Sequence, residues 1–421
     1  MLFDNLGPYH VARLRAAAGV CDLLAVEFRR VSREYAWGET AERPFRSVTL
    51  DRGAGTFRQR LEQELERFRP EAVLVPGWGT KEALTALRWC LKWKVPAVVM
   101  SESTSWDEAR SAWRERIKGR IVRLYSAALV GGRAHREYLM QLGFPAERIE
   151  TGYDAVDNGY FQRETDRIRS RGQAKAPYFL ASARFLRRKN LDGLLKAYAL
   201  YVNSTKREPW KLVILGDGAE RRRLEALAGE LAPEDRRWPQ LLHAGGWATA
   251  APSKMGDGEA VNSESGRRNS ETKDQGGAGV RFEGFRQYGE LPGYYAGAGA
   301  FVHPAHEEPW GLVVNEAMAS GLPVLVSRRC GCAGDLVAEG ENGFLLDLRD
   351  VGEMAGKLRQ VAEMGREERE RMGRRSREIV EGYGPEQFAG GMEKAVEAGI
   401  RHGNGRKGVM ERLLLKGLTR R

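Results

Sequence analysis

Two glutamates, Glu308 and Glu316, are separated by seven residues in the second half of the chain. The apolar run Ala300–Val302 predicts a short buried strand before them, and residues 311–320 predict the helix that follows. In a parallel sheet, the loop between such a strand and helix is where ligands bind. Carboxylates there can accept hydrogen bonds from the hydroxyl groups of a sugar or a ribose. A helix cap beside a solvated glutamate is the simpler alternative.

Two further segments carry groups that suit a phosphate. Arg184 and Lys189 follow the predicted strand Tyr178–Ala181. Arginine can clamp two phosphate oxygens, and lysine supplies a point charge. The first turn of the helix that contains Glu316 offers N–H groups without a partner inside the helix, and these can point at an anion. The residues of that turn are Gly311, Leu312 and Val313.

Together these segments resemble the retaining glycosyltransferases of family 4, which have the GT-B architecture. The resemblance covers roughly residues 177–347, with landmarks in the family's order at Ser182–Asn190, Leu215–Glu220, Val280–Phe285 and His303–Leu336. Similarity in the first half is looser and rests on Gly7–His10, Leu129–Arg133 and Gly152–Asn158. The implied fold class is α/β, with two Rossmann-like domains facing across a cleft and C-terminal helices crossing back to the first domain.

The resemblance also implies a role for each residue of the site. The predicted catalytic residues are Glu308, which would contact the transferred sugar, and Arg184 and Lys189, which would stabilise the diphosphate leaving group. Glu316 would hold the ribose hydroxyls and face a solvent-filled cleft. The predicted donor-binding residues are Glu316, Gly311, Leu312, Val313, Arg281 and Phe282, the last two through the backbone beside the base. Enzymes of this family are thought to react on the front face, with the donor phosphate taking the acceptor proton.

Two residues are candidates for the acceptor side. His10 follows the first strand, in a segment where the family often has a paired-glycine loop and this chain has one glycine. A helix-terminal histidine is the alternative for His10. Glu102 follows the predicted strand Ala97–Met100, where many relatives place a histidine. It could bind hydroxyl groups of the acceptor or sugar, or simply cap a helix.

The composition limits the class of protein. A chain of 421 residues with 42% hydrophobic residues is long enough for two α/β domains. It has no transmembrane-length apolar run and no signal-peptide pattern, and we read its four cysteines as reduced thiols. These features predict a cytoplasmic protein, with contact to the inner face of a membrane left open. The net charge of +11 favours anionic partners without choosing among them.

Apolar strand-like runs alternate with helical patterns over residues 2–153 and again after Pro177, which predicts two βαβ units in tandem. The first set of strands is Asp22–Phe28, Ala72–Val75, Ala97–Met100 and Ala127–Val130, with helices at Val11–Ala18, Thr56–Phe68, Lys81–Lys92, Ala109–Tyr125 and Ala134–Leu142. The second set of strands is Tyr178–Ala181, Leu212–Leu215, Phe301–Val302, Val324–Ser327 and Phe344–Leu346, followed by helices Glu353–Met364, Arg366–Glu381 and Pro385–Ala398.

These patterns predict domains at 1–165 and 177–384, then a returning helix and basic tail at 385–421. The charged residues 163–176 indicate a linker, and the polar stretch at about 244–279 indicates a disordered insertion. The helix predicted at Ala109–Tyr125 joins six cations to an apolar stripe formed by Trp113, Ile117, Ile121 and Leu124. Either that stripe packs on the sheet, or the helix recruits the protein to anionic lipid.

We therefore predict a retaining glycosyltransferase that moves a sugar from a nucleoside diphosphate sugar to a glycan, lipid-linked or small-molecule acceptor. No cofactor is expected, and no metal, because the chain lacks an Asp-x-Asp after an apolar strand and histidines at ligand spacing. One alternative is a sugar-nucleotide epimerase of the same fold. The other is a basic nucleic-acid-binding protein, but the chain lacks the aromatic-basic motifs of known modules, so we expect no nucleic acid partner.

Overall fold

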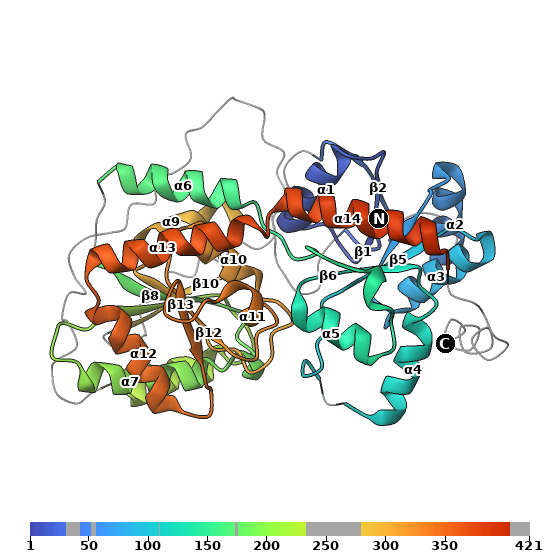
Figure 1. Cartoon of the computed structure of the whole chain (residues 1–421). Coiled ribbons are helices and arrows are strands. Elements are labelled where there is room, and N and C mark those ends of the chain that lie inside the picture. Colours follow the sequence, from blue (N-terminus) through green and yellow to red (C-terminus); the bar gives the residue numbers. More distant parts are fainter. Residues whose placement is uncertain (31–42, 52–55, 109, 173–175, 233–278, 405–421) are drawn as a thin grey trace, which may run out of the picture.

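The computed structural model of the protein describes residues 1–30, 43–51, 56–108, 110–172, 176–232 and 279–404. They form two α/β units side by side, and near its end the chain passes from one to the other through two successive helices, α13 (Arg366–Glu381) and α14 (Pro385–His402) (Figure 1). We call the unit formed by β1 to β7 the N-domain and the unit formed by α6 to α13 the C-domain. Every strand pair within the described residues is parallel.

The N-domain sheet consists of two hydrogen-bonded groups, β1-β2-β3 and β4-β5-β6-β7, and β1 lies beside β4. Its strands are β1 (Leu2–Phe3), β2 (Leu24–Glu27), β3 (Arg46–Thr49), β4 (Val73–Pro76), β5 (Ala97–Ser101), β6 (Ala127–Val130) and β7 (Ile149–Thr151). Strands β5 and β6 are buried along their whole length. Strands covered on both faces read as continuous apolar runs, which is why these two were predictable.

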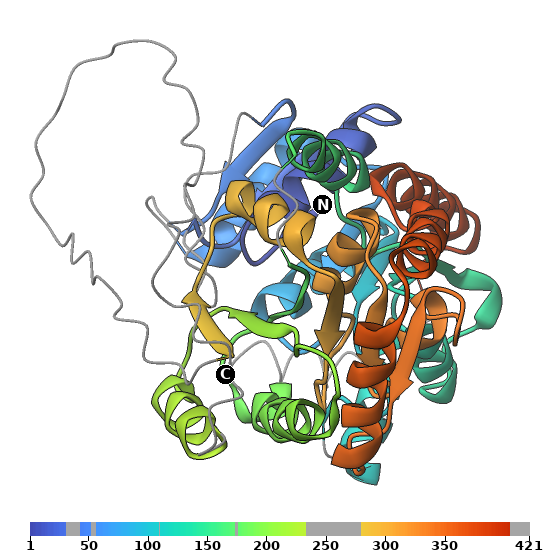
Figure 2. The same ribbon diagram turned by 90° about the vertical axis from the view of Figure 1, so that its left-hand side faces the viewer.

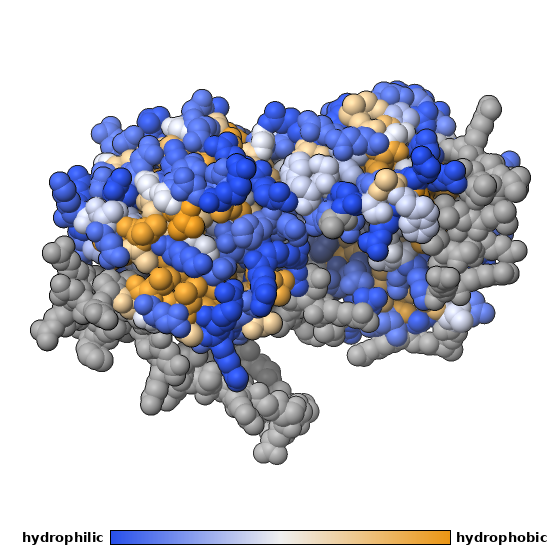
Figure 3. All heavy atoms as spheres, turned by 90° about the horizontal axis from the view of Figure 1, so that it is seen from below, coloured by the Kyte–Doolittle hydropathy of each residue, from blue (hydrophilic) through white to orange (hydrophobic). Residues whose placement is uncertain are grey.

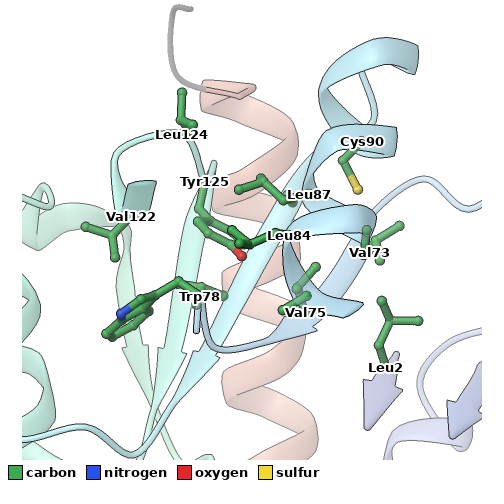
Figure 4. Close-up of a cluster of buried hydrophobic side chains, with 14 of the residues drawn as sticks. Leu2, Val73, Val75, Trp78, Leu84, Leu87, Cys90, Val122, Leu124 and Tyr125 are labelled. Carbon is green, nitrogen blue, oxygen red and sulfur yellow. The ribbon is translucent and has the colours of Figure 1, made fainter. Parts of the chain in front are cut away.

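Helices cover both faces of the N-domain sheet. They are α1 (Pro8–Ala18), α2 (Phe57–Phe68), α3 (Lys81–Trp93), α4 (Ala112–Val122) and α5 (Arg133–Gln141). Leu84 and Leu87 of α3 point into a cluster with Val75 of β4 and the ring of Tyr125 (Figure 4). The Tyr125 hydroxyl donates a hydrogen bond to the carbonyl of Gly77 at 2.9 Å, so its one polar atom is satisfied inside this core.

The C-domain sheet has the order β10-β9-β8-β11-β12-β13. Its strands are β8 (Tyr178–Ser182), β9 (Lys211–Leu215), β10 (Val280–Gly284), β11 (Ala300–His303), β12 (Val324–Ser327) and β13 (Gly343–Leu346). From β8 the chain proceeds outward through β9 and β10, and from β11 it proceeds outward in the other direction. The loops after β8 and β11 therefore diverge at a topological switch point, which is where open α/β sheets bind ligands.

Two layers of helices enclose this sheet (Figure 2). One layer contains α7 (Leu191–Ser204), α8 (Arg221–Glu230) and α12 (Val351–Glu363), and the other contains α6 (Asn158–Ser170), α9 (Leu291–Gly297), α10 (Leu312–Ala319) and α13 (Arg366–Glu381). The short helix α11 (Ala333–Leu336) lies on the side toward the N-domain. Seen from below, the molecule is mainly hydrophilic, with hydrophobic groups gathered over parts of the C-domain half (Figure 3).

The last described helix, α14 (Pro385–His402), crosses back to the N-domain as predicted. Its buried residues, among them Phe388 and Met392, pack with α1 and with the sheet. The helix approaches so closely that a Cβ at Gly391 would lie 2.3 Å from the carbonyl oxygen of Thr151 in β7. A residue with a side chain there would push α14 away from the sheet.

The structure corrects three predictions of local structure. Residues 163–170 are not a linker: they form the second half of α6, which packs on α9 and α10. Strands β3, β7 and β10 were missed because they are short or only partly buried, so their apolar pattern is weak. Helix α4 begins at Ala112 rather than Ala109, and residue 109 itself lies outside the described ranges.

The apolar stripe predicted on α4 does not pack as one face. Ile121 and Leu124 are buried, but Trp113 is 71% exposed. Nor do all the cations face water, because Arg110 lies over the ring of Tyr138, with its guanidinium carbon 4.3 Å from the ring centre. The polar insertion at 244–278 and the tail at 405–421 lie outside the described residues. No helix in the described ranges is long and apolar enough to cross a membrane.

Candidate active site between the domains

Arg184 and Lys189 lie in the loop that joins β8 to α7. Arg184 is partly exposed, whereas Lys189 is buried. The glycine-rich turn after β9 supports this loop, because a Cβ at Gly216 would lie 1.9 Å from the carbonyl oxygen of Ala183. Gly216 also has a φ of +122°, which favours glycine. The Gly-Asp-Gly turn is thus a support for the loop that carries Arg184.

Lys189 and Glu308 meet because β8 and β11 are neighbours in the sheet. The Lys189 ammonium donates a hydrogen bond to Oε2 of Glu308, and Nε2 of His303 lies 2.9 Å from the same oxygen. Burial by itself raises the pKa of Glu308, but the hydrogen bond from His303 and the charge of Lys189 lower it to about 2. Glu308 is therefore a charged carboxylate at neutral pH, held in one position.

Gly311 brings the start of α10 against this carboxylate. It precedes the first helical residue, Leu312, and has a φ of +103°. A Cβ at this position would lie 3.3 Å from Cγ of Glu308, so a side chain would be strained and would crowd the site. The N–H groups at the amino end of α10 belong to Gly311, Leu312 and Val313, as predicted. The positive end of the helix dipole thus adjoins Glu308.

Glu316 does not face solvent, which corrects the prediction of a solvent-facing carboxylate. It is fully buried, and both of its oxygens accept hydrogen bonds from tyrosine hydroxyls. Tyr295 of α9 donates at 2.6 Å, and Tyr9 donates from the N-domain. Burial raises the pKa of Glu316 to about 7, although both tyrosine hydrogen bonds act in the opposite direction. A hydroxyl-bearing ligand would have to replace a tyrosine hydroxyl on this carboxylate.

The two residues predicted to border the base lie on the edge strand β10. Arg281 forms an ion pair with Glu283 of the same strand. The Phe282 ring makes an edge contact with Phe185, with ring centres 5.9 Å apart. Because Phe185 follows Arg184 in the chain, this ring contact packs β10 against the loop after β8. Base contact by either residue stays a prediction.

The two domains touch through several polar contacts around Trp310, which is fully buried between them. A Cβ at Gly132 of the N-domain would lie 2.8 Å from Cζ3 of Trp310, so the double glycine 131–132 makes room for the indole. Nearby, Nε2 of His135 lies 2.9 Å from the carbonyl oxygen of Pro309. The backbone N–H of Arg133 donates to Oδ2 of Asp335 at 3.2 Å. The face of the C-domain that carries Glu308 therefore adjoins the carboxyl ends of the N-domain strands.

The acceptor-side candidates occupy different surroundings. His10 lies in the first turn of α1, and its Nδ1 accepts a hydrogen bond from the backbone N–H of Gly7 at 3.2 Å. Burial lowers its pKa well below the usual range. This geometry favours the helix-terminal alternative for His10. Glu102 follows β5, is partly exposed, and adjoins Asp154, which follows β7 and is fully buried.

Sequence reasoning missed Tyr9, His303, Trp310 and Asp154 as members of this site. Tyr9 and Glu316 are 307 residues apart, so no local pattern indicates their contact. His303 and Trp310 stand beside the spaced glutamates, and that position was a signal that could have been used. Within the described ranges, no group of three or more histidine, cysteine or acidic residues could hold a metal ion. Metal independence stays a prediction.

Comparison with known proteins finds relatives for the second half of the chain. The model of the glycosyl transferases group 1 matches residues 162–237 and 262–379. Sulfoquinovosyl transferase SQD2 of Arabidopsis thaliana is 44% identical over 105 residues, which are 24% of this chain and 20% of that protein. Alpha-1,3/1,6-mannosyltransferase alg-2 of Neurospora crassa is 40% identical over 98 residues, 23% of this chain and 21% of that protein. The matches span about a fifth of these relatives.

Two solved structures share the fold over nearly the whole chain. Anabaena HepE in complex with UDP and glucose has a TM-score of 0.65 at 16% identity, covering 94% of this chain and 98% of HepE. Sucrose-phosphate synthase of Thermosynechococcus elongatus has a TM-score of 0.64 at 19% identity, covering 91% of this chain and 90% of that one. At these identities the likeness shows the fold alone. The predicted GT-B architecture is confirmed.

Proposed function

Because the chain belongs to the glycosyl transferases group 1, we propose that it transfers a sugar from a nucleoside diphosphate sugar to an acceptor. The observation that carries the proposal is the Lys189–Glu308–His303 cluster at the switch point of the C-domain sheet. It combines a fixed carboxylate, a buried cation and a helix start where the loops after β8 and β11 meet. A sugar diphosphate needs all three, because it presents hydroxyl groups and a phosphate charge together.

Each part of the donor has a partner of suitable chemistry in the proposal. Arg184 and Lys189 hold the diphosphate, and the N–H groups at the start of α10 add donors beside it. Glu308 accepts hydrogen bonds from the hydroxyl groups of the transferred sugar. Glu316 takes the ribose hydroxyls in place of the hydroxyl of Tyr9. As negative charge develops on the leaving diphosphate, the two cations stabilise it.

We further propose that transfer retains the anomeric configuration and proceeds without a metal. The donor phosphate takes the proton of the acceptor on the face from which the diphosphate leaves. Without a metal, Arg184 has to neutralise the negative charge of the leaving diphosphate that a metal cation would otherwise neutralise. Free nucleoside diphosphate appearing together with a glycosylated product, of the same anomeric form as the donor, is the expected result. An altered sugar nucleotide without release of diphosphate would instead favour an epimerase.

The identity of the nucleotide that the protein binds is tested by thermal shift with UDP, GDP, ADP and their glucose or mannose derivatives. A ligand that binds only the folded state stabilises it by about 2.7 kcal/mol at a concentration 100 times its Kd. We expect one base to raise the melting temperature more than the others. UDP-glucose is the first donor to try, because HepE, which shares the fold, was solved with UDP and glucose. No shift with any nucleotide at millimolar concentration would contradict the proposal.

Replacing Arg184 with alanine is expected to lower turnover about 100-fold with little effect on folding, because a charge-assisted hydrogen bond contributes about 1.5–3 kcal/mol. Its partly exposed position makes a loss of core packing small. Turnover and melting temperature are measured on the same preparation. Arg187, which is exposed in the same loop, is the matched control, and its alanine variant should keep wild-type turnover. Normal turnover in Arg184→Ala would remove this residue from the site.

Peripheral contact with an anionic membrane is a further part of the proposal. The exposed side chains on α4 that support it are Trp113, Arg114 and Arg116. We expect vesicles with anionic lipid to capture more protein than neutral vesicles at low salt, since each surface cation contributes about 1 kcal/mol that salt screens. The control is the Arg114→Glu, Arg116→Glu double variant, which should lose the difference. Equal capture by both kinds of vesicle in the wild type would leave a soluble acceptor as the better proposal.

A further inference from the structure

Three neighbouring strands of the N-domain end at the edge that faces Glu308. Ser101 of β5 pairs with Val130 of β6, which pairs with Thr151 of β7. The next residue after Ser101 is Glu102, so it is level with Gly131, which follows β6. Asp154 comes three residues after Thr151 and reaches back across the end of β6. A Cβ at Gly131 would lie 2.3 Å from Oδ2 of Asp154, so the glycine makes room for this carboxyl group.

Asp154 is a buried carboxyl group in unusual surroundings. It has no exposed surface, and no N–H or hydroxyl donor among the described residues reaches either oxygen, so the group that can share a hydrogen bond with it is the carboxyl of Glu102. A buried carboxylate that receives no hydrogen bond from an N–H or hydroxyl group is unfavourable and tends to keep its proton. Glu102, the adjacent carboxyl group, is partly exposed. The pair therefore has an inner member without solvent contact and an outer member that water or a ligand can reach.

The charges around the pair come from several elements. Burial, followed by the charge of Glu102, raises the pKa of Asp154 well above its usual range. Burial also raises the pKa of Glu102, although the positive charge of Arg13 acts against it. Arg13 is itself buried, and its Nη1 donates to the carbonyl of Tyr153 at 2.6 Å. The titratable groups that face the pair from neighbouring elements are Arg13, Tyr153, His135, Glu308 and Cys332.

We propose that Glu102 and Asp154 form a proton-sharing carboxyl pair that receives the acceptor, with Glu102 in contact with a hydroxyl group of a neutral carbohydrate. Asp154 acts behind it as a positioning residue that holds the shared proton. This rests on the proposed transferase function and names the acceptor class for the same site. A pair with one proton between two carboxyl groups both donates and accepts hydrogen bonds, which suits a hydroxyl group because a hydroxyl does the same.

Other acceptor chemistries fit this place less well. An acceptor phosphate would meet the negative charge of Glu308 from the C-domain as well as that of the pair, and the proposed function already assigns Lys189 to the donor diphosphate. An ammonium group donates but cannot accept, so it would not use the shared proton. The pair is thus expected to favour a neutral polyol over an anionic acceptor.

The shared proton is tested by melting temperature between pH 5 and 9 in the wild type and in Asp154→Asn. Carboxyl groups whose folded pKa is raised stabilise the protein below their unfolded pKa, and this stability is lost as pH rises. Asparagine cannot ionise, so the melting temperature of the variant relative to wild type should rise by about 3 °C or more across this range. Glu316 titrates in both proteins, so its effect cancels in the difference between their melting temperatures. A constant difference at all pH values would show a merely structural Asp154 and overturn the pair.

Contact with the acceptor is tested by saturation-transfer NMR with glucose and maltose as probes in the presence of UDP. We expect signals from the neutral sugars in the wild type and a loss of about 10-fold in affinity in Glu102→Gln. A stronger signal from glucose 1-phosphate, or none from either neutral sugar, would overturn the assignment. UDP should still raise the melting temperature of Glu102→Gln. If UDP did not raise the melting temperature of the wild type, the result would instead count against the transferase function itself.

Discussion

Replacing Glu316 with glutamine is expected to lower turnover by one to two orders of magnitude, because a hydrogen bond to a charged group contributes about 1.5–3 kcal/mol. The same change should remove a pH dependence of stability of about 3 kcal/mol, which follows from a pKa near 7 in the folded state and 4.5 when unfolded. Both effects come from one carboxyl group. Turnover and the free energy of unfolding between pH 4 and 8.5 are the measurements.

The direction of this pH effect follows from burial. Because the folded pKa of Glu316 is raised, its contribution is fully present below pH 4.5 and is lost as pH rises through about 7. Glutamine keeps the shape and does not ionise. The variant should therefore gain stability relative to wild type as pH rises. If the difference in free energy of unfolding between the variant and the wild type stayed the same from pH 4.5 to 8, the pKa of Glu316 would not be raised by burial.

Two tyrosine variants separate the partners of this carboxyl group. Tyr295→Phe removes the hydroxyl from within the C-domain and leaves the contact between domains in place. Tyr9→Phe removes the hydroxyl that comes from the N-domain. Glu316→Ala is a poorer test, because it would leave both hydroxyls without an acceptor and open a cavity in the core. A carboxylate that faced the solvent, as predicted from the sequence, could have been truncated without this loss of stability.

Glu316 also shows how far the sequence could lead. Its helix and strand were predictable, because Ala300–Val302 is an apolar run and α10 ends before Gly321 and Pro323. The burial of its carboxyl group was not predictable, since the tyrosine that closes it comes from α1. Contacts between domains depend on how two separately folded units meet, and a local pattern carries no information about that.

The same distinction holds for the rest of the candidate site. The loops with Arg184, Lys189 and Glu308 were placed correctly after their strands because each follows a strongly apolar strand of a parallel sheet. Asp154 was overlooked because an aspartate after a short strand reads as an ordinary turn residue. Its significance comes from Gly131 and Glu102 on neighbouring strands. Helix α6 was mistaken in part for a linker because its exposed face is charged, while Phe161 and Thr165 are its buried contacts.

Replacing Lys189 with methionine is expected to destabilise the protein by about 3 kcal/mol, because removing one partner of a buried ion pair leaves the other charge uncompensated. It should also lower turnover at least about 100-fold if the ammonium holds the donor diphosphate. Side chains of the pair are 8% and 13% exposed, so water can compensate little of the loss. Chemical denaturation and initial rates are the measurements, both at pH 7.5.

The double variant Lys189→Met, Glu308→Gln distinguishes the two causes. Glutamine removes the uncompensated charge, so most of the lost stability should return, while turnover stays low because both the cation and the carboxylate are absent. The pH dependence of stability also distinguishes the loss of the ion pair from the loss of donor binding. In the wild type the pKa of Glu308 is about 2, so its stabilising contribution is present above pH 4.5 and is lost as pH falls toward 2. Without Lys189 the pKa of Glu308 is higher than in the wild type, because only the contribution of His303 still lowers it, so Lys189→Met should lose less stability than the wild type as pH falls. If the double variant were no more stable than the single one, Lys189 would act through packing rather than through its charge on Glu308.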